Sequence, residues 1–141
     1  KEWLKDAGCD NLDAFNKATG EGLPRLVFAC DEVAELLDRT GRSKEDKERL
    51  NQIENRLATL ARLGRAFGIH LILATQRPDA NILPGQIKNN MDFRVCGRAE
   101  SVLSGIILDN TSAAEQIPKD ARGRFITGDG TVFQAYYMEG L

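Results

Sequence analysis

Two adjacent carboxylates, Asp31 and Glu32, follow an apolar run that begins at Leu26. A buried strand that ends in Asp-Glu is the pattern of a Walker B motif. In that chemistry the first carboxylate holds Mg²⁺, usually through water, and the second activates the water that attacks the terminal phosphate of a nucleotide. Acidic residues also favour the first turn of a helix through its dipole. The pair alone therefore leaves a catalytic and a structural interpretation open, and favours the structural one.

A second polar group follows another apolar run. Residues 69–75 (IHLILAT) read as a buried strand that leads into Gln76, Arg77 and Pro78. Nucleotide-driven motors often keep a polar sensor of the terminal phosphate at such a strand end, although a polar turn broken by proline has the same composition. Ligands of parallel sheets bind at the carboxyl ends of the strands. Two polar strand ends in one small sheet favour the nucleotide site.

The elements that must position these residues alternate between helix and strand. Residues 47–67 carry apolar side chains at steps of three and four, which predicts a helix ended by Gly68. Ser43 and Asp46 have capping-box spacing before it. The charged run 39–48 reads as a solvated loop. The other expected elements are helices in 2–19, from 33 to 38 and in 99–108, a loop or short helix in 79–91, a buried strand at 26–30, a further strand at 93–97, and a hairpin of 123–126 with 131–137.

This order predicts an α/β fold, with a mostly parallel sheet flanked by helices and an antiparallel hairpin at one edge. The chain has 19 Lys and Arg against 21 Asp and Glu, so a strongly basic nucleic-acid surface over its whole length is excluded, but a local patch is not. Three cysteines without C-x-x-C spacing predict reduced thiols and a cytosolic environment. No apolar stretch approaches the roughly 20 residues of a membrane helix.

Two segments carry a resemblance to a known family. GIHLILATQRPDANILPGQIKNNMDFRVCGRAES resembles the region after the Walker B strand in FtsK/SpoIIIE motor ATPases, and RLVFACDEVAELL resembles that strand with its DE-x-A-x-L continuation. Together they span most of residues 25–110. The spacing and the upstream GCDNLDAFN are most similar to the coupling-protein ATPases of integrative and conjugative elements. Type VII secretion ATPases share much of the pattern.

The resemblance implies roles for individual residues. Asp31 would serve Mg²⁺, Glu32 would be the catalytic base, and Gln76, assisted by Thr75, would sense the terminal phosphate of ATP. Arg94 or Arg98 would be an arginine finger that reaches a neighbouring subunit's nucleotide; the alternative for each is a solvated surface residue. The resemblance does not choose between the two arginines.

Other residues have plainer interpretations. His70, the only histidine, reads as a packed or hydrogen-bonded residue of a strand and not as a metal ligand. Arg77, before Pro78, is a candidate for a structural role at the strand end. Family members grip DNA with loops that line a central pore, and the charged run with Arg42 and Lys44 is a candidate for such a loop.

One expected motif is absent. A P-loop requires Gly-Lys-Ser or Gly-Lys-Thr, and the sequence contains no Gly-Lys dipeptide. We expect residues 1–141 to be the C-terminal part of one RecA-like P-loop ATPase domain that lacks its P-loop half. Residues 1–24 would be a helical lead-in, and residues 25–141 would run from the Walker B strand to the hairpin. The isolated chain should then have little ATPase activity.

The resemblance implies that the intact parent is a hexameric, ATP- and Mg²⁺-dependent translocase of double-stranded DNA, acting in segregation or conjugative transfer. It would be cytoplasmic or held at the inner face of the membrane by a missing N-terminal region, with a relaxase or other conjugation proteins as further partners. Two alternatives stay open. One is a type VII-like protein secretion motor, and the other is a degenerate, non-catalytic scaffold domain.

Overall fold

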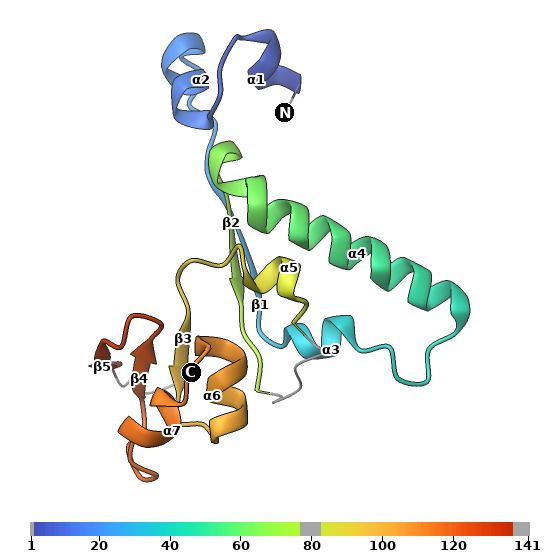
Figure 1. The fold of residues 1–141 in the computed structure, drawn as a ribbon. Helices are drawn as coiled ribbons and strands as arrows, with labels where there is room; N and C mark the ends of the chain where they lie inside the picture. Colours follow the sequence, from blue (N-terminus) through green and yellow to red (C-terminus); the bar gives the residue numbers. More distant parts are fainter. Residues whose placement is uncertain (1, 77–82, 137–141) are drawn as a thin grey trace. The chain divides into compact units, whose positions relative to one another are not determined.

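The computed structural model describes residues 2–76 and 83–136 (Figure 1). Its contacts divide the chain into two compact units. The first is described over residues 2–76 and 85–90, and the second over residues 83–84 and 91–136. None of the helices in these described ranges is long and apolar enough to cross a membrane.

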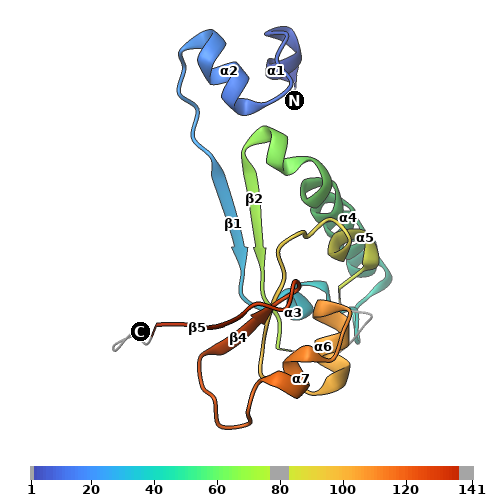
Figure 2. The same cartoon turned by 60° about the vertical axis from the view of Figure 1, so that its left-hand side comes forward.

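The first unit is built around a pair of parallel strands. Strand β1 (Leu26–Cys30) pairs with β2 (Ile69–Leu73), in a register that places Leu26 beside Ile69 and Cys30 beside Leu73. Figure 2 shows the two strands side by side and pointing the same way. Its helices are α1 (Glu2–Asp6), α2 (Leu12–Thr19), α3 (Val33–Leu37), α4 (Lys44–Leu63), η1 (Gly64–Phe67) and α5 (Gly85–Lys88).

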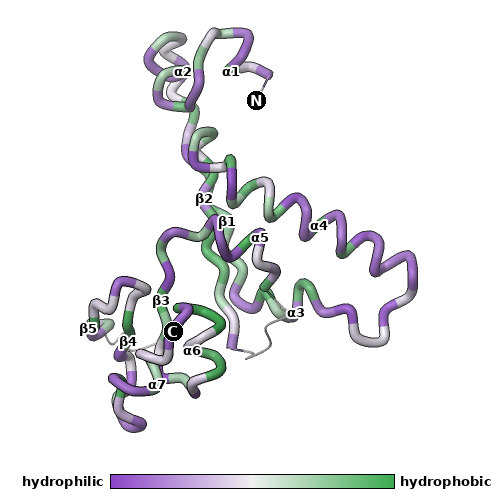
Figure 3. The backbone as a smooth tube through the Cα atoms, in the orientation of Figure 1, coloured by the Kyte–Doolittle hydropathy of each residue, from purple (hydrophilic) through white to green (hydrophobic). Residues whose placement is uncertain are grey.

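The long helix α4 begins at a side-chain cap, and the 3-10 turn η1 that continues it after Leu63 ends at a glycine. Ser43 caps its first turn, because the Ser43 hydroxyl accepts from the Asp46 amide at 3.1 Å and donates to the Asp46 carboxylate at 2.8 Å. The expected cap is therefore confirmed, but the helix starts at Lys44, inside the run predicted to be a loop. Gly68 stops η1 with φ 69°, a left-handed conformation that glycine adopts without a Cβ penalty. Figure 3 shows the hydrophilic character of most of α4, interrupted by apolar positions.

The prediction that the first strand is buried on both faces is wrong for this structure. Leu26, Val27 and Phe28 are 60%, 64% and 45% exposed. Among the described elements β1 has one strand partner, β2, and α4 contacts β2. The apolar composition of β1 is that of a central strand, but the described residues leave most of the strand exposed.

The second unit is an antiparallel sheet with two short helices. Its strands β3 (Val95–Gly97), β4 (Arg124–Thr127) and β5 (Val132–Gln134) follow the order β3-β4-β5. The predicted hairpin is confirmed, and its turn is held by Asp129, whose carboxylate accepts from Thr127 and Thr131. These hydrogen bonds lower the pKa of Asp129. The third strand pairs with this hairpin, so the described strands form a parallel pair and a separate antiparallel sheet, and not one mostly parallel sheet.

The helices of the second unit are α6 (Ser101–Leu108) and α7 (Ser112–Gln116). Helix α6 was expected from the sequence, whereas α7 was not. Both contribute to a small core that also takes side chains from β3 and β4: Cys96, Ala99, Leu108, Ala113, Ile117 and Ile126. Burial raises the pKa of the Cys96 thiol.

Candidate active site

The ends of β1 and β2 are locked together by main-chain hydrogen bonds. The Ala74 amide donates to the Cys30 carbonyl at 2.8 Å, and the Val33 amide donates to the Ala74 carbonyl at 2.9 Å. The main-chain hydrogen bonds between the two segments thus continue beyond the end of β2, as far as Val33, the first residue of α3. Because both strands run in the same direction, the residues that follow them, 31–32 and 75–76, emerge at the same edge of the sheet.

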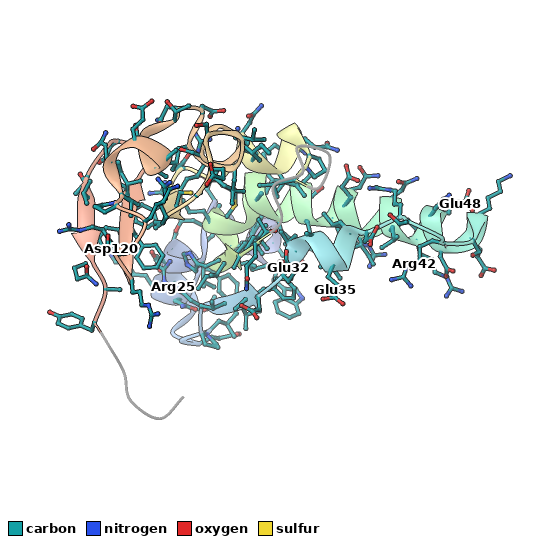
Figure 4. All side chains as sticks on the ribbon, turned by 90° about the horizontal axis from the view of Figure 1, so that it is seen from below. Arg25, Glu32, Glu35, Arg42, Glu48 and Asp120 are labelled. Carbon is teal, nitrogen blue, oxygen red and sulfur yellow. The ribbon has the colours of Figure 1, made fainter. Side chains whose placement is uncertain are left out.

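Glu32 is the residue on which these segments converge. Its Oε1 accepts from the Thr75 hydroxyl at 2.6 Å and from the Ala34 amide at 3.1 Å, and its Oε2 accepts from the Gln76 amide at 2.9 Å. The side chain is half-buried, at the start of α3 (Figure 4). The sequence placed Glu32 and Thr75 at neighbouring strand ends, but it did not predict the bond between them.

The structural interpretation of the acidic pair is also supported. Glu32 is the N-cap of α3, since its carboxylate accepts the Ala34 amide and its backbone lies outside the helical region. The helix that follows is packed through its buried apolar residues Val33, Ala34 and Leu37. Glu32 therefore has a structural function whatever its chemistry, and catalysis would be an additional one.

Asp31 is compatible with a magnesium site that takes most of its ligands from substrate and water rather than from protein side chains. It is exposed beside Glu32 at the sheet edge. No group of three or more His, Cys, Asp or Glu side chains that could hold a metal occurs in residues 2–76 and 83–136. Mg²⁺ in nucleotide sites is usually held by one or two carboxylates, substrate phosphates and water. A single exposed carboxylate at a strand end is compatible with that type of coordination.

The remaining residues of this edge come from the end of β2. Thr75 is half-buried and Gln76 is exposed, and the main-chain bond from Gln76 to Glu32 fixes where the Gln76 side chain begins. Arg77 lies outside the described residues. Four residues, 31–32 and 75–76, thus bring two carboxylates, a hydroxyl and an amide side chain to this edge.

Arg94 and Arg98 belong to the second unit, where each binds the end of a helix. Arg94 donates to the Ile107 carbonyl at 3.1 Å and to the Asp109 carboxylate at 2.6 Å, at the C-terminus of α6. Arg98 donates to the carbonyls of Ala114 and Ile117, at the end of α7. A cation is favourable at a helix C-terminus. Neither arginine is the solvated surface residue of the alternative interpretation, because both are half-buried.

The other residues singled out in the sequence lie elsewhere. His70 is in β2 and half-buried, with its Nε2 3.5 Å from the Arg25 guanidinium, and Arg25 itself pairs with Asp13 at 2.7 Å. Arg42 and Lys44 are exposed next to the N-terminus of α4. Figure 4 shows Arg42 and Glu48 at that end of the unit and Glu32 at the start of α3.

Comparison of the sequence with known proteins identifies one family. The FtsK/SpoIIIE family model matches residues 10–80. The chain is 35% identical over 117 residues to the DNA translocase FtsK of Chlorobaculum tepidum, and 32% identical over 121 residues to the DNA translocase SftA of Bacillus subtilis. Each alignment covers 82% of this chain, but only 13% and 12% of those two relatives.

Two solved structures are similar to the chain over almost all of its length. The pCW3 conjugation coupling protein TcpA, in a monomer form with ATPγS, has a TM-score of 0.87 at 43% identity, over 96% of this chain and 39% of that one. The cytoplasmic domain of the Thermomonospora curvata type VII secretion ATPase EccC has a TM-score of 0.71 at 26% identity, over 99% of this chain and 16% of that one. The resemblance seen in the sequence is confirmed: the chain belongs to the FtsK/SpoIIIE family.

Proposed function

We propose that the chain is the Walker B part of an ATPase motor domain, and that its full-length protein translocates double-stranded DNA during conjugative transfer. The observation that carries this proposal is the position of Glu32, held between the ends of two parallel strands with Asp31 beside it. Relatives named as DNA translocases and the likeness to a conjugation coupling protein support the DNA cargo.

The proposed reaction is phosphoryl transfer from ATP to water. The water oxygen forms a bond to the γ-phosphorus while the bond from that phosphorus to the β–γ bridging oxygen breaks, and ADP leaves with the electron pair. Glu32 takes the proton that the water loses and returns it to solvent after ADP and phosphate form. Gln76, whose main chain already binds Glu32, would sense the terminal phosphate with its side chain.

Mg²⁺, when bound, would neutralise charge on the phosphates, and Asp31 would hold it through water. Phosphate binding in this scheme requires a P-loop, which would come from a part of the domain outside this sequence. The exposed apolar β1 is compatible with further strands packing beside it, because a two-stranded sheet is marginal by itself.

The active ring would be a hexamer whose sites lie between subunits. Arg94 or Arg98 would then complete the site of a neighbour, which requires either guanidinium to exchange its helix-end carbonyls for a phosphate. Exposed Arg42 and Lys44 are candidates for DNA contacts. We propose cytoplasmic action, with the parent at the inner face of the membrane and a relaxase among its partners.

A protein secretion motor is the second candidate, because the EccC likeness extends over 99% of the chain. The higher identity to TcpA favours DNA transfer. A non-catalytic scaffold would keep the fold and the Glu32 cap, without turnover.

The test is ATP hydrolysis by the full-length protein with and without duplex DNA, at one fixed salt concentration because phosphate contacts are salt-sensitive. We expect duplex DNA to raise the turnover rate several-fold, and an unfolded polypeptide at the same mass concentration to leave it unchanged. Stimulation by polypeptide alone would favour the secretion motor. Absence of hydrolysis under all conditions would leave the scaffold.

A further inference from the structure

The hydroxyl of Thr75 is directed at a protein carboxylate. Thr75 Oγ1 donates to Glu32 Oε1 at 2.6 Å, in a half-buried position at the end of β2. A threonine hydroxyl has one proton to donate. Phosphate oxygens in ATP accept hydrogen bonds, so they require donors from the protein. While Thr75 gives its proton to Glu32, that proton is not available to a phosphate.

We propose that Thr75 is a positioning residue that acts through Glu32, and not a direct phosphate sensor. This inference rests on the proposed function, because it assigns a role in the proposed hydrolysis. It differs from the expectation drawn from the family resemblance, in which Thr75 assists Gln76 at the terminal phosphate. Glu32 remains the group that takes the proton from water, and Thr75 determines where the carboxylate lies when it does so.

The hydrogen bonds around Glu32 let Thr75 orient its carboxylate. A glutamate side chain has several rotatable bonds, and an unrestrained carboxylate seldom occupies the one geometry that meets an in-line water. Here one oxygen is held by Thr75 and Ala34 and the other by the Gln76 amide. Thr75 and Gln76 come from the same segment, so the carboxylate is fixed relative to the residue proposed to sense phosphate.

The rest of the local structure explains why the hydroxyl can hold its direction. The Ala74 carbonyl and amide are both bonded to the segment that carries Glu32, to Val33 and Cys30 respectively. The backbone on either side of the Thr75–Glu32 bond is therefore joined independently of that bond. Removal of the hydroxyl should leave the strand ends in register and loosen the Glu32 carboxylate.

The test compares Thr75→Val and Thr75→Ser in the full-length protein. Valine keeps the size and strand preference of threonine without the hydroxyl, whereas serine keeps the hydroxyl. We expect Thr75→Val to lower kcat about 10- to 100-fold, the range found when a residue that orients a metal ligand is lost, with the KM for ATP and the melting temperature close to wild type. Thr75→Ser should retain most of the wild-type kcat.

A matched control is Thr59→Val. Thr59 is exposed on α4, and its hydroxyl donates to the Asn55 carbonyl of the same helix at 2.9 Å. This variant removes a threonine hydroxyl from the same unit without touching Glu32, so kcat and KM should stay at wild-type values. If Thr75→Val does not fold, Thr75→Ala gives the same comparison against Thr75→Ser.

A double variant separates action through Glu32 from independent action. In a Glu32→Gln background, Thr75→Val should cause no further loss of kcat. Two results would overturn the inference in favour of a direct contact with substrate. One is a kcat in the double variant that is lowered by the product of the two single effects, and the other is a raised KM with unchanged kcat in Thr75→Val. Wild-type kcat in Thr75→Val would overturn it as well. The proposed function fails separately, when wild type and Glu32→Gln have equal turnover.

Discussion

Glu32→Gln in the full-length protein should lower ATP turnover by about 10²- to 10⁴-fold, the usual contribution of a general base. This corresponds to about 3 to 5 kcal/mol of transition-state stabilisation. A glutamine amide is nearly the same size as the carboxylate, but it cannot take a proton from water. It also brings an NH₂ group to a position where Thr75, Ala34 and Gln76 all present donors. ATP binding, measured with a fluorescent analogue, should persist because Glu32 does not hold the phosphates in this scheme.

Glu35→Gln is the control for this variant. Glu35 is exposed on α3, one turn of helix from Glu32 and directed away from the strand ends (Figure 4). The Glu35→Gln variant loses the same charge from the same short helix. It should turn over ATP at the wild-type rate. If Glu32→Gln hydrolyses ATP as fast as Glu35→Gln, then the acidic pair only starts a helix.

Ile126→Ala should destabilise the second unit by about 2 to 5 kcal/mol, the range for removing a large buried aliphatic side chain. Ile126 is fully buried in β4, among Cys96, Ala99, Leu108 and Ile117. With so few side chains in this core, little can move to fill the space that alanine leaves. Hydrogen exchange at the Thr127 amide, which donates to Thr131 within the hairpin, reports on this unit specifically.

Val132→Ala is the matched control for Ile126→Ala. Val132 is opposite Ile126 in the β4–β5 register, but its side chain is 38% exposed. It should cost less than about 1 kcal/mol, since a partly exposed site loses less burial and forms a smaller cavity. Equal exchange rates at Thr127 in the two variants would contradict the assignment of Ile126 to the core.

Local chemistry explains why most elements could be predicted. The Ser43 cap, the stop at Gly68 and the turn at Asp129 depend on neighbours within a few residues, so the sequence carries their signal directly. The acidic pair and Thr75 were placed correctly at strand ends for the same reason. Each follows an apolar run whose length suits one strand.

Features that depend on tertiary partners could not be predicted in this way. The apolar residues of β1 indicate a central strand, but whether a strand is covered depends on which other elements pack on it. Helix α7 begins at Ser112 without a side-chain cap of its own. It is held by Ser104 of α6, whose buried hydroxyl accepts the Ala113 amide at 3.1 Å and donates to the Asn110 carbonyl at 2.7 Å.

The same limit applies to the candidate site. The Thr75–Glu32 bond joins residues 43 positions apart, and only the parallel register of β1 and β2 brings them together. The helix-end contacts of Arg94 and Arg98 span 13 to 19 residues and depend on the packing of α6 and α7. Composition and spacing could name these arginines but not their partners.

Displacement of a triplex-forming oligonucleotide from duplex DNA by the full-length protein is a direct test of DNA translocation, because displacement requires movement along the duplex and not only binding. We expect displacement with wild-type protein, ATP and Mg²⁺, and none with Glu32→Gln or without ATP. ATP hydrolysis by the wild-type protein that leaves the triplex in place on every duplex length tried would contradict a DNA translocase.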